Sequence, residues 1–186
     1  MPSHIHAARC VASVALLASV ATTPAHAEVA AIAEAMVAAF KDTCLAEQHS
    51  SLNGLRSAAL ADGWTHQSVR VVSTATGSRL DGAAGPKFLR KGDFTLSLAP
   101  DPVSGTHVCA VSASFDVPLT TKLLAQTVSD ALNVGEPTLL PDGRSERALW
   151  RLEGRVHVEA TVKRKSSLLD ARLVARPAEP QFARRH

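Results

Sequence analysis

Histidine and cysteine are the side chains of this chain that most directly suggest chemistry, because both ligate metals and serve in catalysis. The histidines beyond residue 27 are His49, His66, His107, His157 and His186. No two of them have the H-x-x-x-H spacing typical of zinc ligands. The nearest approach is His107 with Cys109, which would share one face of a strand. We therefore expect no metal site, and no motif predicts a cofactor.

Nucleophilic and acid–base catalysis leave no signature in the sequence either. The chain contains neither a G-x-S-x-G elbow nor an S-x-x-K motif, and its carboxylates are scattered rather than paired as in glycosidases. The loop Gly82-Ala83-Ala84-Gly85-Pro86 lacks the lysine–serine pair of a P-loop. Because a catalytic triad assembles in space from distant positions, enzymatic activity stays uncertain, and the sequence favours a protein without catalytic residues.

Basic side chains gather on one face of the three strands expected nearest the C-terminus. Alternation along each strand places them away from the core. They are Arg147, Arg151, Arg155, His157, Lys163 and Arg172. Glu153, Glu159 and Asp170 share that face, so one interpretation is a set of exposed cross-strand ion pairs, each contributing roughly a few tenths of a kcal/mol. The other is an interaction face for an acidic partner, either an envelope protein or an anionic envelope polymer.

Residues 1–27 have the pattern of a secretory signal peptide. Residues 1–9 carry one basic side chain and no acidic one, an apolar run covers residues 11–21, and Ala25-His26-Ala27 is a typical cleavage site. The run is shorter than the roughly 20 apolar residues that span a bilayer. Cleavage after Ala27 would give a periplasmic or secreted protein with no stable membrane insertion. The alternative is a buried N-terminal helix.

Length and net charge limit the number of domains and the kinds of partner that the remaining chain can have. Residues 28–175 have the size of a single α+β domain. Residues 176–186, with two prolines and three arginines, are expected to form a disordered tail. The formal net charge of the whole chain is only +3. Such a near-balanced surface exerts no general attraction on nucleic acid, so we expect no nucleic-acid partner.

Two cysteines, Cys44 and Cys109, remain after removal of the signal peptide. An even count in an oxidising compartment favours a disulfide. Cys44 follows Phe40 by one turn on the apolar face of an expected helix, and Cys109 alternates with core residues on an expected strand. Both sulfurs thus face the core and predict a helix-to-sheet disulfide, with two separate buried thiols as the alternative.

Periodicity predicts two main helices and six strands. Apolar residues at every fourth position indicate a helix over residues 28–48, and a second helix is expected from Pro118 to Asn133, with Gly135 as its left-handed C-cap. A short helical piece is expected near residues 56–61. The strands are expected at residues 67–73, 93–98, 106–115, 146–153, 155–163 and 168–175, with a loop at 74–87. The order α-β-β-β-α-β-β-β, helix–meander–helix–meander, predicts an α+β fold with an antiparallel sheet packed on two helices.

A small set of residues carries a resemblance to a known group of proteins. The set consists of Phe40-x-x-x-Cys44-Leu45, the step Gly63-Trp64, and then Cys109 and Trp150. In this combination the chain resembles uncharacterised small exported proteins of Gram-negative bacteria. That group has no known activity, so the resemblance implies the fold and the disulfide and assigns no functional residue.

These observations favour a non-enzymatic binding or interaction module of the cell envelope that acts through the basic face. The first alternative is a small periplasmic hydrolase or an inhibitor-like module with a cleft near Trp64, His66 and the loop at 74–87, because long irregular loops are often functional. The second alternative is a small-ligand carrier, which requires an apolar cavity between the helices and the sheet.

Overall fold

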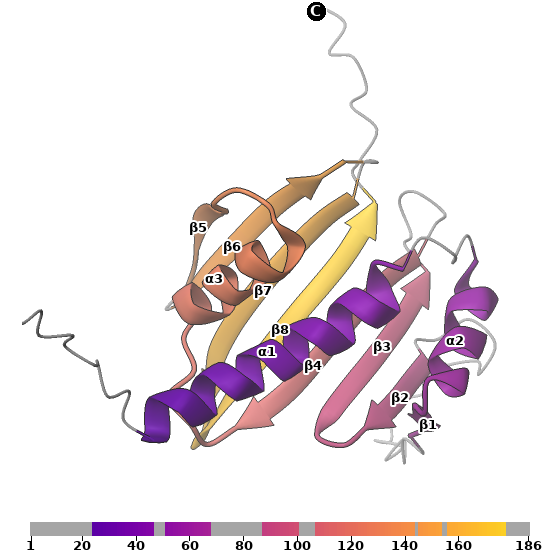
Figure 1. Ribbon diagram of the computed structural model, residues 1–186, viewed down its shortest axis with the longest axis horizontal. Helices are drawn as coiled ribbons and strands as arrows, with labels where there is room; N and C mark the ends of the chain where they lie inside the picture. The colour runs from indigo at the N-terminus through magenta and orange to yellow at the C-terminus, as the bar shows by residue number, and fades with distance from the viewer. Residues whose placement is uncertain are drawn as a thin grey trace, which may run out of the picture.

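The computed structural model describes residues 24–46, 51–67, 87–100, 107–143, 145–153 and 156–177 (Figure 1). Its helices are α1 (Pro24–Cys44), α2 (Leu52–Ala61) and α3 (Thr121–Leu132). Its strands are β1 (Thr65–His66), β2 (Lys87–Lys91), β3 (Phe94–Pro100), β4 (His107–Phe115), β5 (Thr138–Asp142), β6 (Ser145–Leu152), β7 (Val156–Lys165) and β8 (Leu168–Pro177). The α+β class and the antiparallel sheet expected from the sequence are confirmed.

All the described strands belong to one antiparallel sheet with the order β1-β2-β3-β4-β8-β7-β6-β5. The first four strands form one meander and the last four form another. The two meanders meet at the centre of the sheet, where β4 pairs with β8. Each half therefore contains a meander that runs from one edge to the centre, and the order of the elements gives the sheet an approximate twofold arrangement.

The core lies between the helices and one face of the sheet. All the described helices lie on the near side of the sheet in Figure 1. α1 contributes Met36, Val37 and Phe40, which have no exposed surface, and it contacts α3, β4 and β8. α3 covers β6 and β7, and α2 buries Leu55 against the same core. Because side chains alternate along a strand, the opposite face receives every second residue and is covered by none of these helices.

α3 is fixed to the second meander by polar contacts near both of its ends. At its first residue, the Thr121 hydroxyl donates to the Glu146 carbonyl and accepts from the Val162 amide, each at 3.2 Å. Near its last turn, the indole nitrogen of Trp150 donates to Ser129 Oγ at 3.2 Å. The buried polar groups at this helix–sheet contact therefore satisfy one another, which fixes where α3 lies on β6 and β7.

The helix boundaries differ from those expected. α1 covers Pro24–Cys44 rather than residues 28–48. α3 begins after a Thr120 N-cap rather than at Pro118, since the Thr120 side chain accepts a hydrogen bond from the helix's first turn. Its left-handed C-cap is Asn133, with φ at 51°, and not Gly135. Asparagine tolerates this backbone conformation and ends the helix before the glycine is reached.

Three strands are present that the sequence pattern did not predict, namely the two-residue β1, β2 and β5, so the expected order of elements was incomplete. In β2 only Leu89 is fully buried, and β5 has no fully buried residue. β5 is an edge strand, and β2 lies next to the other edge, where it pairs on its outer side only with the two-residue β1. Strands in such positions lack the clear alternation of apolar and polar residues that marks a half-buried strand.

Several expected segments lie outside the described residues. The strand expected at 67–73 is one of them, except for Gln67, which follows β1 and whose amide donates to the Phe88 carbonyl at 3.1 Å. The loop expected at 74–87 is another, except for Lys87, the first residue of β2. The expected tail was wrong at its start, because Arg176 and Pro177 complete β8.

Cys44 and Cys109 form the expected disulfide. Cys44 is the last residue of α1, Cys109 lies on β4, and their Cα atoms are 5.5 Å apart. The bond joins residues 65 positions apart in the sequence. It ties the C-terminal end of α1 to a central strand of the sheet.

Removal of this disulfide tests its contribution to stability. In the chain-entropy model, cross-linking a loop of 65 residues stabilises the fold by about 4 kcal/mol. We expect the double variant Cys44→Ala/Cys109→Ala to lower the free energy of unfolding by about 2–4 kcal/mol in urea denaturation. The wild-type protein under reducing conditions should lose a similar amount, and an unchanged midpoint in both samples would contradict the expectation.

Candidate functional site

The predicted basic residues lie on the face of the sheet opposite the helices, which we call the open face. They alternate along β6, β7 and β8 with core residues such as Ala148, Val158 and Ala171. The members that the structure describes are Arg147, Arg151, His157, Lys163 and Arg172. Arg155 lies outside the described residues. The structure thus brings five of the six candidates onto one surface.

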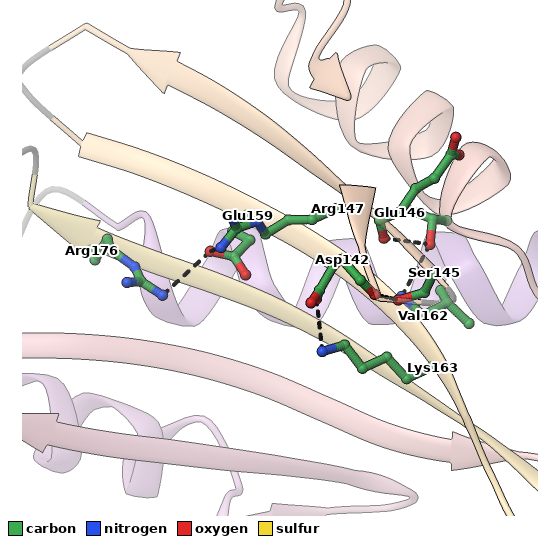
Figure 2. A network of polar contacts seen from close by, with 9 residues as sticks. Asp142, Ser145, Glu146, Arg147, Glu159, Val162, Lys163 and Arg176 are labelled. Carbon is green, nitrogen blue, oxygen red and sulfur yellow. Dashed lines mark hydrogen bonds and ion pairs between the residues drawn. The ribbon is translucent and has the colours of Figure 1, made fainter. Parts of the chain in front are cut away.

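Glu159 organises part of the open face. Its carboxylate lies 3.4 Å from an Arg176 nitrogen on β8 and 3.8 Å from an Arg147 nitrogen on β6 (Figure 2). The Glu159 side chain is only 15% exposed, whereas both arginines are more open to solvent. One carboxylate therefore serves two guanidinium groups, and a positive charge is left over.

Lys163 has a partner of its own. Its Nζ lies 2.7 Å from the Asp142 carboxylate on β5 (Figure 2). The hydrogen bond from Lys163 holds the pKa of Asp142 below its usual value. Because the folded-state pKa is lowered, this contact stabilises the fold above the unfolded-state pKa of the carboxyl, and the contribution disappears as the pH falls through the folded-state value. Lys163 is therefore already paired with a carboxylate.

Arg151 and His157 contact each other across β6 and β7. Arg151 Nε donates to His157 Nε2, with the two nitrogens 3.3 Å apart. Arg176 is the register partner of His157 on its other side. Among the described residues no carboxylate pairs with Arg151, and its charge remains available to a ligand.

Arg172 occupies the centre of the open face. It lies on β8, between Ser112 on β4 and Thr161 on β7. Its side chain is exposed and makes no ion pair with any residue in the described ranges. A guanidinium group without a fixed partner on a rigid central strand is suited to bidentate contact with a carboxylate or phosphate.

A groove of about 800 Å³ runs along the open face beside Arg172. Small polar side chains from β3 and β4 form much of its surface, and Arg90 stands on the opposite side from Arg172. Its described lining is Gln67, Phe88, Arg90, Asp93, Thr95, Ser97, Ala99, Ser112, Ala113, Ser114, Asp170, Ala171 and Arg172. Asp170 accepts a hydrogen bond from Ser114 Oγ, so one of its carboxylate oxygens is already engaged.

Sequence reasoning missed Arg90 and the hydroxyl residues of the groove. The polar positions of residues 93–98 were visible as an alternating pattern, but β2 was not predicted, and Arg90 therefore had no assigned face. The pairing of β4 with β8, which places the groove beside Arg172, joins segments far apart in the chain. No local pattern reports such a pairing.

Trp64 and His66 are the described members of the expected cleft, whereas the loop at 74–87 lies outside the described residues except for Lys87. Trp64 is only 2% exposed and belongs to the core. His66 is exposed, and its described polar contact is with an Arg56 nitrogen at 3.3 Å. Within the described ranges, neither a carboxylate nor a hydroxyl is hydrogen-bonded to His66.

A second groove, of about 740 Å³, bears on the carrier hypothesis. It lies between the first half of α1 and the ends of β3 and β4, and its apolar lining includes Ile32, Phe94 and Phe115. Glu28 and Asp116, both exposed, also line it. A groove that opens to solvent in this way differs from the enclosed apolar cavity that a carrier of apolar ligands needs.

The part of the chain that the structure describes contains neither a metal site nor a helix that could cross a membrane. No group of three or more histidine, cysteine, aspartate or glutamate residues there is placed to hold a metal ion. No described helix is long and apolar enough to cross a bilayer. Cys109, which the sequence offered with His107 as a possible pair of metal ligands, is oxidised in the disulfide and cannot act as a thiolate.

Comparisons with known proteins give no relative of this chain. No protein-family model matches it, no curated protein matches it, and no solved structure matches its fold. The resemblance to exported proteins of Gram-negative bacteria therefore stays a prediction.

The ion-pair cluster around Glu159 gives a prediction for stability. Substitution Glu159→Gln leaves Arg147 and Arg176 without their shared carboxylate. We expect it to lower the free energy of unfolding by about 1 kcal/mol, and the loss should shrink at high salt. Glu153→Gln is the matched control, because Glu153 is exposed, and it should change stability by less than about 0.5 kcal/mol. Equal effects of the two variants in urea denaturation would show that the cluster contributes nothing.

Proposed function

We propose that this protein is an exported, non-enzymatic binding module of the cell envelope whose open face holds an anionic partner. The observation that carries the proposal is the position of Arg172 and Arg151 on that face, exposed and with no acidic partner among the described residues. The partner is an acidic envelope protein or an anionic envelope polymer. In either case its carboxylate or phosphate groups would meet guanidinium groups held on a rigid sheet.

The distribution of charge over the open face supports this function over mutual ion pairing alone. Glu159 and Asp142 neutralise part of the set, yet Glu159 is shared by two arginines, and Arg151 contacts a histidine rather than an acid. The guanidinium group of an arginine presents its donors in a planar fork that suits a carboxylate or phosphate.

Location outside the cytosol is part of the proposal. The N-terminal segment has the pattern of a signal peptide, and a disulfide such as Cys44–Cys109 persists in an oxidising compartment. The position of the core is compatible with cleavage after Ala27, because that residue is exposed and Val29 is the first described buried residue of α1. The mature chain would begin with its core-forming part of α1 intact.

Charge reversal on the open face tests the proposal. We expect the purified mature protein to bind immobilised polygalacturonate and poly-L-glutamate, more weakly as salt rises, and not to bind neutral dextran. The variant Arg151→Glu/Arg172→Glu should lose at least about tenfold in affinity, since two charge-assisted contacts become repulsive. Biolayer interferometry with folding checked by circular dichroism is the measurement.

A matched control separates the open face from overall charge. Lys41→Glu/Lys122→Glu makes the same change in net charge on exposed residues of α1 and α3, on the other side of the sheet. It should bind within about twofold of the wild type. Equal losses in the two double variants, or binding to dextran as strong as to polygalacturonate, would overturn the assignment of the open face.

A further inference from the structure

Residues at matching positions of neighbouring strands form one continuous row across the open face. From β2 to β6, each residue of the row is the register partner of the next. This arginine row consists of Arg90, Thr95, Ser112, Arg172, Thr161 and Arg147. Its first three members come from the first meander and its last three from the second, so the row exists because β4 pairs with β8 (Figure 1).

The row places arginines at wide intervals along a line that crosses the strands. Arg90 and Arg172 are separated by three strand spacings, and Arg172 and Arg147 by two. With neighbouring strands about 4.8 Å apart, their backbone positions are about 14 Å and about 10 Å from one another. Between them the row carries hydroxyl side chains, the half-buried Thr95 and Ser112 in the first interval and the buried Thr161 in the second.

The guanidinium groups of the row have donors to spare. Arg172 makes no ion pair within the described ranges. Arg90 uses its Nε on the Gly92 carbonyl at 2.8 Å, which leaves its two terminal nitrogens. Arg147 reaches Glu159 with one terminal nitrogen at 3.8 Å, and although its Nε is buried, its second terminal nitrogen makes no ion pair with a described residue. Each arginine therefore has unused donors for a planar anion.

The groove of about 800 Å³ lies over the first part of the same row. Arg90, Thr95, Ser112 and Arg172 all belong to its lining. Beside them the groove is lined by small side chains such as Ser97 and by the carboxylates of Asp93 and Asp170, so an extended chain whose own carboxylates are widely spaced can approach the sheet between the two arginines. The register of the strands and the shape of the surface thus point to the same site independently.

We propose that the arginine row binds one chain of a linear polysaccharide in which carboxylated sugars are separated by neutral ones. The chain lies across the strands, with its carboxylates at the three arginines and its hydroxyls at Thr95 and Ser112, which line the groove between Arg90 and Arg172. This inference rests on the proposed function and deepens it, because it names the chemistry of the partner and extends the site to Arg90.

The spacing of the row favours such a polysaccharide over a nucleic acid. Phosphates recur about every 3.4 Å along each strand of a duplex, so most of them would face no cation on this surface. Single-stranded nucleic acid is held by stacking on exposed aromatic rings, whereas the aromatic residue in the described lining of the groove, Phe88, is half-buried. Isolated carboxylates on a hydroxylated chain match both the arginines and the hydroxyls of the row.

Oligosaccharides of defined length test the row. We use hyaluronan fragments of two, four, six and eight sugars as probes, in which acidic and neutral sugars alternate, and measure affinity by isothermal titration calorimetry. Affinity should rise with length and then level off once a fragment spans the three arginines. Arg90→Gln and Arg172→Gln should each weaken the longest fragment by about five- to tenfold, as expected for loss of one charge-assisted contact.

Controls make the outcome specific to the row. Lys122→Gln removes the same charge from the helical side and should bind within about twofold of the wild type. Arg172→Lys keeps the charge without the bidentate fork and should recover only part of the affinity. Neutral maltooligosaccharides of the same lengths should not bind.

The results separate this inference from the proposed function. If Arg90→Gln binds the longest fragment as tightly as the wild type, or if affinity does not depend on length, the row is not the binding track. Another outcome is that hyaluronan fragments fail to bind while poly-L-glutamate binds the wild type and not Arg151→Glu/Arg172→Glu. That result would overturn the polysaccharide as the ligand of the row and leave the proposal of an anionic partner intact. If none of these polyanions binds, both proposals fail.

Discussion

β4 and β8 pair in antiparallel register from Cys109 to Phe115 on one strand and from Leu169 to Ala175 on the other. This ladder joins two meanders that would each be an open half-sheet with an exposed edge. It also brings α1 and α3 into contact over one continuous surface, which allows a single core to form. The open face has its shape and its charge pattern only in the joined sheet, because Ser112 and Arg172 become neighbours through this pairing.

The one-sided position of the helices explains why the two faces of the sheet differ so much. Burial of apolar side chains is the dominant favourable contribution to folding, and α1 and α3 supply it on one face. The other face receives hydroxyl and charged residues from the same strands by simple alternation, together with a few apolar ones such as Ala110 and Val174. A charged side chain is costly to bury and is stable where water or a ligand can reach it, so this face remains available for binding without weakening the core.

Much of this arrangement could be read from the sequence, and the rest depends on non-local pairing. The alternation of Ala148, Trp150 and Val158 with Arg147, Arg151 and His157 gave the correct face for each residue, because a buried strand face has a strict period of two. The disulfide followed from the inward phases of Cys44 and Cys109. β2 and β5 could not be recognised, since strands at and near an edge bury too little to show that period.

The ends of elements were predicted less well, for a different physical reason. Asn133 and Gly135 both suit a left-handed cap, and the choice between them depends on hydrogen bonds and packing at the end of α3. The indole of Trp150 donates to Ser129 on α3 and to the Gly135 carbonyl, which fixes the chain after the helix. Backbone propensity shows which residues are able to end a helix, and contacts with the rest of the fold determine which of them does so.

The dependence of the arginine row on β4 and β8 has a consequence for how the site is maintained. Arg90 belongs to the first meander, while Arg172 and Arg147 belong to the second, so neither half carries the whole row. The register between the halves must therefore be exact to the residue, since a slip by one position sends the side chains of one half to the core face. Cys109 begins the β4–β8 ladder and is bonded to α1. Because α1 also packs on α3 and β8, the disulfide holds β4 to the element that spans both halves, and this restricts the slippage that would take the row apart.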